Sequence, residues 1–231
     1  MKSYIILILL VGIAYANSVQ NEFVWDEAAL IVNNPRIDLP IKEIPSILVK
    51  PLWDIPSFGK EYPQVYYRPI LSAFYVLNYK VWGLNPSGFH LSNILLHLIS
   101  AMVLYRVGLI FFNDKLISLI GASIFAVHPV HNESVGRAAA GEVIFGFFII
   151  LSIYFFLKEK RYISCLTFFL ALLSKETSVM LPFALVILST NKNGIKRGVM
   201  EMIPYAALIG VYLLMRLMFV DVAFGEKVAQ P

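Results

Sequence analysis

The sequence has little charge and only one cysteine. Asp, Glu, Lys and Arg make up 15% of its 231 residues, whereas hydrophobic residues make up 58%. A typical soluble domain has about 25% charged residues. The one cysteine, Cys165, lies in an apolar run and cannot form an intramolecular disulfide. These shortages exclude a cytosolic globular enzyme, a disordered chain and a disulfide-stabilised scaffold.

Sequence motifs of nucleotide binding and of serine hydrolases are also missing. The chain has no Walker A motif, no Gly-rich dinucleotide loop and no Gly-x-Ser-x-Gly motif. This argues against a cytosolic nucleotide-driven pump. The net charge is +4, but the excess Lys and Arg of a membrane protein usually sit in its cytoplasmic loops. We therefore expect membrane lipid, and no nucleic acid, as a partner.

Long apolar runs separated by short polar stretches are the main feature that is present, and the mean hydropathy is +0.72. A span needs about 17 to 25 mostly apolar residues. The sequence predicts an all-α, polytopic membrane protein with about seven to eight hydrophobic segments, several of them short enough to be tilted or broken helices. The segments are 3–19, 69–82, 89–112, 116–130, 138–157, 162–173, 178–189 and 202–220.

We expect one membrane domain over 1–231, with a first span in 1–19, an exoplasmic loop at 17–68 and a helical bundle at 69–231. The alternative for the first segment is a cleaved signal peptide, because Ala14-Tyr15-Ala16 has the pattern of a cleavage site.

The loop at 17–68 differs from the rest of the chain because it combines acids, prolines and aromatic side chains. Trp and Tyr favour the membrane–water interface, so we expect short helices along the bilayer surface. Long loops without secondary structure are uncommon and usually carry function.

Two basic loops predict the orientation. Lys and Arg gather at 158–161 and 192–197, which places both loops in the cytoplasm. The exoplasmic side then holds 17–68, 128–142 and 174–176. Three hydrophobic segments lie between the exoplasmic loops 17–68 and 128–142, but only an even number of spans can connect two loops on the same side. One segment therefore does not cross the membrane. We expect it to be 69–82, which is short and contains Asn78 and Lys80.

Ionisable side chains near the membrane are costly and are candidates for function. Asp26 and Glu27 follow the first span directly. Two adjacent carboxylates can supply a general base or bind a divalent cation. The alternative is an acidic helix N-terminus in a solvated loop.

His128 and His131 form a His-x-x-His pair that can bind zinc. However, Pro129 interrupts the helix that would align the two rings, and spacing fixes no third ligand, so a structural role is favoured. Arg137 and Glu142 open the next segment, where an acid suits a helix N-terminus.

Lys175 and Glu176 lie in a tight turn between two hydrophobic segments, where the Lys can bind a phosphate or form a local ion pair. Arg68 precedes a proline at the end of the long loop. A polar stripe at i, i+3 and i+7 shares one helix face, and on a membrane helix such a stripe more often packs against other helices than binds a ligand. Its members are His90, Asn93 and His97.

The order of these motifs resembles a known family. The motifs are Phe23-Val24-Trp25-Asp26-Glu27 with Asn33-Asn34-Pro35, Tyr67-Arg68-Pro69-Ile70-Leu71, Gly83-Leu84-Asn85-Pro86-Ser87-Gly88-Phe89-His90 with Asn93 and Leu96-His97, Ala126-Val127-His128-Pro129-Val130-His131-Asn132-Glu133, and Leu173-Ser174-Lys175-Glu176-Thr177. The set resembles the N-terminal membrane region of GT-C glycosyltransferases, most closely the transmembrane-and-TPR-repeat O-mannosyltransferase-like family. It is more distantly similar to protein O-mannosyltransferases and lipid A aminoarabinose transferases.

The resemblance implies transfer of a sugar from a polyprenyl-phosphate carrier to an acceptor hydroxyl on the exoplasmic side. In that scheme Asp26 is the general base, Glu27 assists it or positions the acceptor, and Arg68 and Lys175 hold the carrier phosphate. The remaining candidates line or support the cavity: His128, His131, Arg137, Glu142, Glu176, His90 and Asn93. The lipid-linked sugar is then a substrate, and a divalent cation is the one cofactor to consider.

Members of that family are usually longer and often carry C-terminal repeats. We therefore expect this chain to correspond to the front portion of a larger enzyme, and a second membrane chain is a possible partner that completes the fold. The alternatives are a non-catalytic membrane subunit and a transporter or flippase, although the sequence has no internal symmetry that favours the latter. The expected location is a prokaryotic cytoplasmic membrane, or the endoplasmic reticulum in a eukaryote.

Overall fold

The computed structural model describes residues 1–53, 66–139 and 141–220, without the side chains of 191–193. Residues 54–65 of the predicted first loop and the side chain of Lys192 therefore lie outside the described residues. Every regular element in the described part is a helix. The α-helices are α1 (Lys2–Tyr15), α2 (Pro69–Trp82), α3 (Pro86–Phe112), α4 (Lys115–Val127), α5 (His131–Gly136), α6 (Gly141–Leu157), α7 (Arg161–Leu172), α8 (Leu181–Asn193), α9 (Ile195–Met200) and α10 (Ile203–Phe219).

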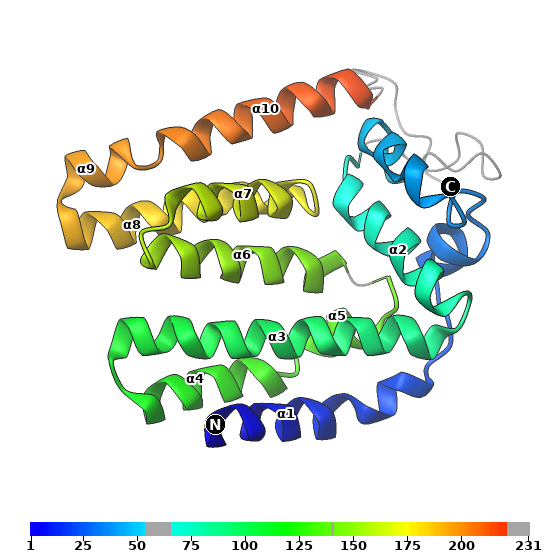
Figure 1. The fold of residues 1–231 in the computed structure, drawn as a ribbon, viewed down its shortest axis with the longest axis horizontal. Coiled ribbons are helices and arrows are strands. Elements are labelled where there is room, and N and C mark those ends of the chain that lie inside the picture. Colours follow the sequence, from blue (N-terminus) through cyan, green and yellow to red (C-terminus); the bar gives the residue numbers. More distant parts are fainter. Residues whose placement is uncertain (54–65, 140, 221–231) are drawn as a thin grey trace.

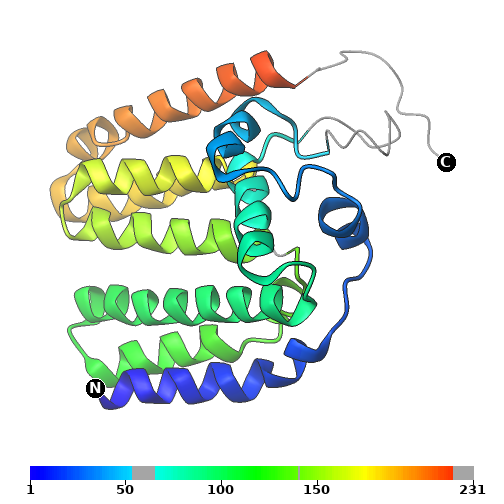
Figure 2. The same ribbon diagram turned by 45° about the vertical axis from the view of Figure 1, so that its right-hand side comes forward.

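Most of the long helices form one bundle. Figures 1 and 2 show α1, α3, α4, α6, α7, α8 and α10 running side by side along the long axis of the molecule. Three helical stretches in the described residues are long and apolar enough to cross a membrane: Lys2–Gln20, Pro86–Phe112 and Ile195–Phe219. Four further apolar helices are shorter: Lys115–Val127, Gly141–Leu157, Arg161–Leu172 and Glu176–Thr190. The all-α membrane prediction is confirmed, whereas the predicted number of spans stays a prediction.

Local signals explain the hairpin of α3 and α4. The Asn85 side chain accepts a hydrogen bond from the Ser87 amide at 3.1 Å, and Pro86 occupies the first turn of α3, where its missing N–H costs nothing. Asn113 ends α3 in the left-handed region, with φ of 49°. The Asp114 carboxylate then caps α4 by accepting from Leu116 and Ile117 amides at 2.7 and 2.8 Å.

The first loop packs onto one end of this bundle. It contains three short helical elements, η1 (Ala16–Gln20), η2 (Ala28–Val32) and η3 (Ile41–Val49). Buried apolar side chains of the loop meet others from α2, α3 and α6 in one cluster: Ala29, Leu30, Ile31, Ile37, Leu52, Trp53, Leu71, Tyr75, Phe89, Ala138 and Ile144. The prediction of short helices in the loop is therefore confirmed, and their position at the bilayer surface stays a prediction.

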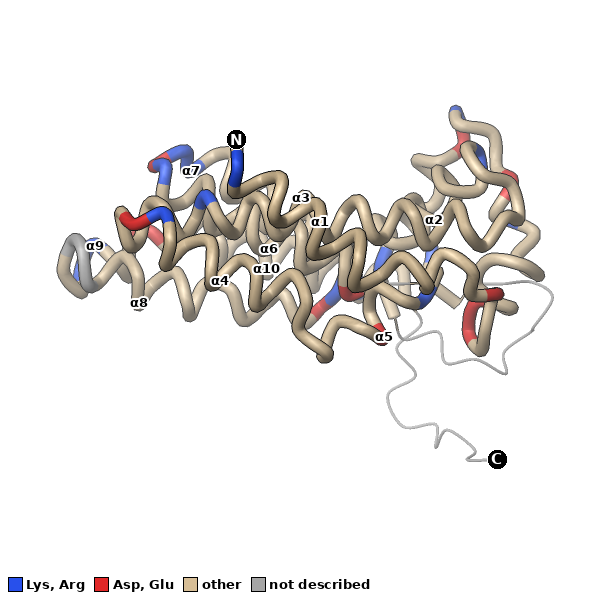
Figure 3. The backbone as a smooth tube through the Cα atoms, turned by 90° about the horizontal axis from the view of Figure 1, so that it is seen from below, with Lys and Arg blue, Asp and Glu red and all other residues tan. Residues whose placement is uncertain are grey.

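The outward faces of the bundle are apolar. On α10, for example, large side chains are strongly exposed: Leu213, Leu214, Leu217 and Met218. Figure 3 shows Lys, Arg, Asp and Glu gathered toward the two ends of the molecule, with an uncharged stretch between them. A helix that is apolar on its solvent-facing side as well as its packed side is typical of a membrane-embedded bundle.

The helix α2 differs from its neighbours in direction. It runs across one end of the bundle at a steep angle to the long helices (Figures 1 and 2). Asn78 is buried in it, and the Lys80 ammonium bonds to the Asp38 carboxylate of the first loop. This arrangement agrees with the prediction that 69–82 does not cross the bilayer, which nevertheless stays a prediction.

Candidate active site

A cavity of ≈ 220 Å³ lies at the end of the bundle that α2 crosses. Residues of the first loop, the start of α2, the segment after α5 and the start of α6 form its wall. Its polar lining consists of Asp26, Tyr66, Arg68, Tyr75, Arg137 and Glu142, of which Tyr66 and Tyr75 were not among the sequence candidates. Four predicted site residues from distant parts of the chain thus share one cavity.

Asp26 presents an exposed carboxylate at this cavity wall. It is exposed, and it has no hydrogen bond or ion pair with the residues that the structure describes. Trp25 precedes it with φ of 53°, a left-handed conformation that a bulky residue rarely adopts. This turn directs the chain into η2 and leaves Asp26 at the cavity rather than in the packed core of the loop.

Glu27 behaves differently from its neighbour. It is fully buried and does not line the cavity. Its carboxylate accepts hydrogen bonds from the Val24 amide at 2.8 Å and the Ala139 amide at 3.1 Å, and Arg137 Nε lies 3.7 Å from Oε1. Glu27 therefore ties the first loop to the segment that leads into α6. These contacts give Glu27 a structural role, whereas its predicted part in assisting the base or positioning the acceptor stays a prediction.

Arg68 is held in a defined orientation at the start of α2. Its Nε and Nη2 donate to the two oxygens of Glu176 at 2.9 and 2.7 Å, a bidentate pair. Its guanidinium also lies 4.6 Å from the centre of the Tyr66 ring. Burial raises the pKa of the Glu176 carboxyl, but the hydrogen bonds and charge of Arg68 outweigh burial and keep that pKa below its ordinary value.

Lys175 makes the second ion pair of the site. Its ammonium bonds to the Glu142 carboxylate and lies 5.5 Å from the centre of the Phe145 ring. Lys175 and Glu176 are consecutive, so one turn after α7 connects both pairs, one to α6 and one to α2. Lys175 and Glu176 therefore pair with residues of other elements rather than within their own turn, as the local alternative had expected. The predicted binding of a phosphate by Lys175 stays a prediction.

Arg137 lies among several acids. Its guanidinium is 3.6 Å from the Glu133 carboxylate and 5.4 Å from the Trp25 ring, in addition to its contact with Glu27. Around the cavity, five acids therefore accompany three bases. They are Asp26, Glu27, Glu133, Glu142 and Glu176 against Arg68, Arg137 and Lys175. An anionic ligand must bind at cations that already have acidic neighbours.

The histidine pair gains no support as a metal site. The two rings are 6.4 Å apart between centroids, and Nδ1 of His128 accepts a hydrogen bond from the Val130 amide at 3.2 Å. His131 packs against Phe125 and His97, with ring centroids at 4.6 and 5.0 Å. Burial, followed by the charge of His128, lowers the pKa of His131. No group of three or more potential metal ligands occurs in the part of the chain that the structure describes.

The polar stripe of α3 mainly packs the bundle. Asn93 donates to the Arg137 and Ala138 carbonyls at 2.7 and 3.1 Å, and so anchors the segment before α6. His97 contacts the Ala126 carbonyl at 3.1 Å, and His90 is fully buried. None of the three lines the cavity of Asp26. The contacts of Asn93 agree with the packing alternative from the sequence, whereas His97 lines a separate cavity together with His131 and Glu142.

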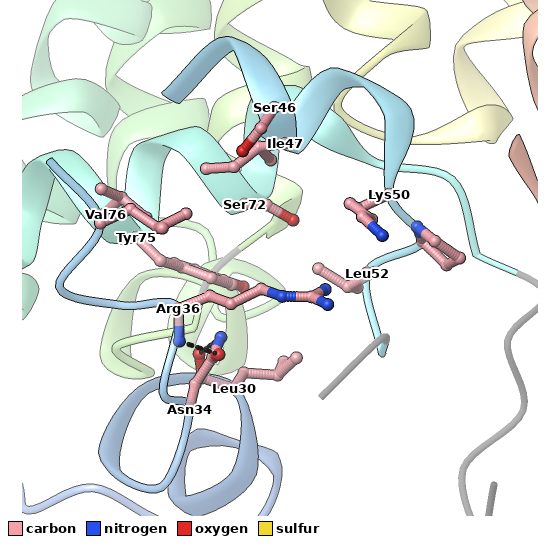
Figure 4. A pocket seen from close by; sticks show the side chains of 12 residues that line it. Leu30, Asn34, Arg36, Ser46, Ile47, Lys50, Leu52, Ser72, Tyr75 and Val76 are labelled. Carbon is pink, nitrogen blue, oxygen red and sulfur yellow. Dashed lines mark hydrogen bonds between the residues drawn. The ribbon is translucent and has the colours of Figure 1, made fainter. Parts of the chain in front are cut away.

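A second, smaller cavity of ≈ 90 Å³ adjoins the first (Figure 4). Leu30, Leu52 and Tyr75 line both cavities and form the wall between them. The Arg36 side chain extends into the smaller one, and its backbone amide donates to Asn34 Oδ1 at 2.9 Å. Sequence reasoning did not select these residues, because only the folding of the loop onto α2 brings them beside Asp26.

Comparison with known proteins points to one group of enzymes. The chain is 30% identical over 227 residues to the Protein O-mannosyl-transferase F38B6.6 of Caenorhabditis elegans. This alignment covers 93% of this chain and 32% of the relative. It is 29% identical to Protein O-mannosyl-transferase TMTC3 of Mus musculus over 69% of this chain and 17% of that protein. It is 34% identical to Protein O-mannosyl-transferase TMTC1 of Homo sapiens over 54% of this chain and 15% of that protein.

The alignments cover only a part of each relative. The chain spans about a third of the length of the nematode relative and less of the two mammalian ones. No protein-family model matches the chain, and no solved structure gives a significant match. The predicted resemblance is nevertheless confirmed: this chain is homologous to a part of the protein O-mannosyl-transferases of the TMTC family.

Proposed function

We propose that this chain contains the sugar-transfer site of a membrane glycosyltransferase, which moves a sugar, mannose by analogy with its relatives, from a polyprenyl-phosphate carrier to a hydroxyl group. The observation that carries the proposal is that an accessible carboxylate, Asp26, and a phosphate-binding type of side chain, Arg68, line the same cavity. The names of the relatives give the same class of chemistry.

The proposed reaction uses two groups on opposite sides of the transferred sugar. Asp26 accepts the proton of the acceptor hydroxyl while that oxygen attacks the anomeric carbon of the sugar. The bond between the anomeric carbon and the phosphate oxygen breaks, and negative charge develops on the leaving carrier phosphate. Arg68 and Lys175 stabilise this charge. Glu27 acts indirectly, because its bonds to the Val24 and Ala139 amides position the loop that carries Asp26.

The existing ion pairs are compatible with phosphate binding. A guanidinium has five N–H donors, and the pair with Glu176 uses one on Nε and one on Nη2 of Arg68. The remaining donors can bind a phosphate oxygen without loss of the pair. Lys175 has three donors on a compact ammonium, of which Glu142 takes one. In this proposal the two acids hold the cations in place before the carrier arrives.

We place the site on the exoplasmic face, in the endoplasmic reticulum, because the relatives come from animals. The orientation is supported by the two basic loops, which lie before α7 and at α9. In Figure 1 these loops are at the left end of the bundle, whereas the cavity lies at the right end beside α2. Basic loops favour the cytoplasmic side, which leaves the cavity on the other.

The test is the substitution Asp26→Asn. Microsomes that contain the chain are supplied with a radiolabelled polyprenyl-phosphate mannose and a peptide acceptor rich in Ser and Thr, and transfer is measured. Loss of a general base is expected to lower the rate by about 10² to 10⁴-fold. Expression and the unfolding temperature should not change, because Asp26 is exposed and unpaired with the described residues.

Glu22→Gln is the matched control. Glu22 is an exposed acid of the same loop that does not line the cavity, so its loss should leave transfer unchanged. Equal transfer by wild type and Asp26→Asn would refute the role of Asp26. A wild-type chain that binds the donor without any transfer would instead favour the alternative of a non-catalytic membrane subunit.

A further inference from the structure

A cavity at the opposite end of the molecule is separate from the candidate active site. It lies between the start of α7, the short helix α9 and the start of α10, and its volume is ≈ 330 Å³. Figure 1 shows these elements at the left end of the bundle, far from α2. The lining combines charged and apolar groups, including Arg161, Cys165, Arg197, Glu201, Pro204 and Tyr205. The sugar-transfer proposal uses none of these residues.

Two guanidinium groups in this cavity share one carboxylate. Arg161 Nη2 donates to Glu201 at 2.9 Å and Arg197 Nε donates to it at 3.4 Å. Arg161 is fixed further by its bond to the Phe156 carbonyl at 2.8 Å and by its position 3.7 Å from the centre of the Phe156 ring. One arginine is thus preorganised, while the Arg197 side chain is 69% exposed and its Nη groups are within reach of a ligand.

The surrounding charge is positive. Glu159 also lines the cavity, so the lining itself has two arginines and two glutamates. Three lysines adjoin these residues in the sequence, and they leave this end of the bundle with an excess of positive charge: Lys158, Lys160 and Lys196. The lysines and arginines together favour an anionic ligand. The positive charge of this end of the bundle attracts the anion, and the two arginines of the cavity bind it.

The cavity borders an apolar, exposed helix face. Tyr162 is 94% exposed, Leu166 is one turn further along α7, and Ile203 begins α10 beside the cavity. Cys165 and Leu166 lie at the i+3 and i+4 positions from Tyr162, so the three side chains share one side of α7. A ligand with a charged head and an apolar tail can therefore place its head in the cavity and its tail along the apolar face of α7. Exposed tyrosines are typical of the membrane–water interface.

We propose that this cavity binds the phosphate-bearing headgroup of an anionic membrane lipid. Arg side chains bind phosphate through paired N–H groups, and basic pockets between membrane helices on the cytoplasmic side commonly hold such headgroups. The phosphate lies against Arg197 and the outer donors of Arg161, and the acyl chains lie along the α7 face of Tyr162 and Leu166. The lipid thereby joins α7 to the helices α9 and α10.

The chain offers its own reporter for this site. Cys165 is the single cysteine and lines the cavity, half-buried. The chain is reconstituted in nanodiscs of phosphatidylcholine with or without phosphatidylglycerol, and the rate of Cys165 alkylation by N-ethylmaleimide is measured. The anionic lipid is expected to slow alkylation several-fold. The compared quantity is the ratio of the two rates within each variant, so that a change in thiol reactivity itself cancels.

Two substitutions at neighbouring positions distinguish specific binding at this cavity from a general electrostatic attraction of anionic lipid to this end of the protein. Arg197→Gln is expected to abolish the protection, whereas Lys196→Gln removes the same charge from the same helix and should retain it. Both residues are exposed, so folding is expected to be preserved and is checked by elution as a single species. Equal loss in the two variants means diffuse attraction and overturns the proposal, as does the absence of protection in wild type.

A further arm identifies the source of the phosphate. The wild-type chain in a neutral detergent is exposed to inorganic phosphate without any anionic lipid. The lipid proposal predicts no protection of Cys165 under these conditions, because the acyl chains supply part of the binding. Protection of Cys165 by inorganic phosphate alone would assign the cavity to a free anion and would overturn the lipid proposal.

Discussion

Asp26 and Glu27 are adjacent in the sequence but have opposite surroundings. Asp26 is exposed at the cavity, whereas Glu27 is fully buried and accepts two backbone hydrogen bonds. A buried carboxylate is stable only when hydrogen bonds or charges compensate for lost hydration. The Val24 and Ala139 amides and Arg137 provide that compensation. The pair therefore divides into an accessible acid and an anchoring acid.

This division predicts different effects of two isosteric substitutions. Glu27→Gln replaces one carboxylate oxygen by an NH₂ group, which cannot accept from an amide, so one buried donor loses its partner. The expected loss of stability is about 1 to 3 kcal/mol. Asp26→Asn should change stability by less than about 0.5 kcal/mol, because that side chain is exposed. Thermal unfolding in detergent compares the two variants with wild type. An unfolding temperature of Glu27→Gln equal to that of wild type would mean that the buried contacts of Glu27 contribute nothing to stability.

At the scale of elements, the turn between α2 and α3 holds α2 across the end of the bundle. Gly88 lies in the first turn of α3 against the Trp82 ring at the end of α2, and a Cβ there would be 2.3 Å from the Trp82 Cγ atom. The Trp82 indole N–H also donates to the Ser92 hydroxyl at 3.0 Å. The absence of a side chain at Gly88 therefore sets how closely the two helices meet.

Gly88→Ala is expected to destabilise the protein by about 1 to 3 kcal/mol, because the added methyl group displaces the Trp82 ring. The control is Gly121→Ala in α4, where the new methyl group meets nothing within 4 Å. That change should raise stability by up to about 1 kcal/mol through the better helix propensity of alanine. The unfolding temperatures of the two variants should move in opposite directions. A destabilised Gly121→Ala would contradict this reading of the two glycines.

Most helix boundaries followed from the sequence. The predicted segments 89–112, 138–157 and 202–220 differ by only a few residues from α3, α6 and α10. Uninterrupted apolar runs and nearby prolines explain this agreement, because both signals are local. The first loop was less predictable. The helix η2 forms where apolar side chains such as Leu30 and Ile31 join a buried cluster with residues of α2 and α6, and such contacts leave no periodic pattern.

At the scale of the whole molecule, the two charged ends give a testable topology. The basic loop at 158–161 lies at one end of the bundle, and the first loop packs onto the other (Figures 1 and 3). In a Cys165→Ser background, the substitutions Glu22→Cys and Lys158→Cys are made in separate variants, and each is treated with a membrane-impermeant maleimide in sealed microsomes. The cysteine at position 158 should be labelled, and the one at position 22 only after the membrane is permeabilised. Labelling of both in sealed vesicles would refute the orientation.

The sequence by itself determined the all-helical membrane class, the positions of the long helices and the group of acids and bases worth considering. These features depend on composition and on runs of neighbouring residues. The tertiary structure alone decided which candidates meet. It separated Asp26 from Glu27, paired Arg68 with Glu176 and Lys175 with Glu142, and removed His90 and Asn93 from the cavity. The physical reason is that a side chain's role depends on which distant groups compensate for its charge and burial, and only the packing of the helices brings those groups together.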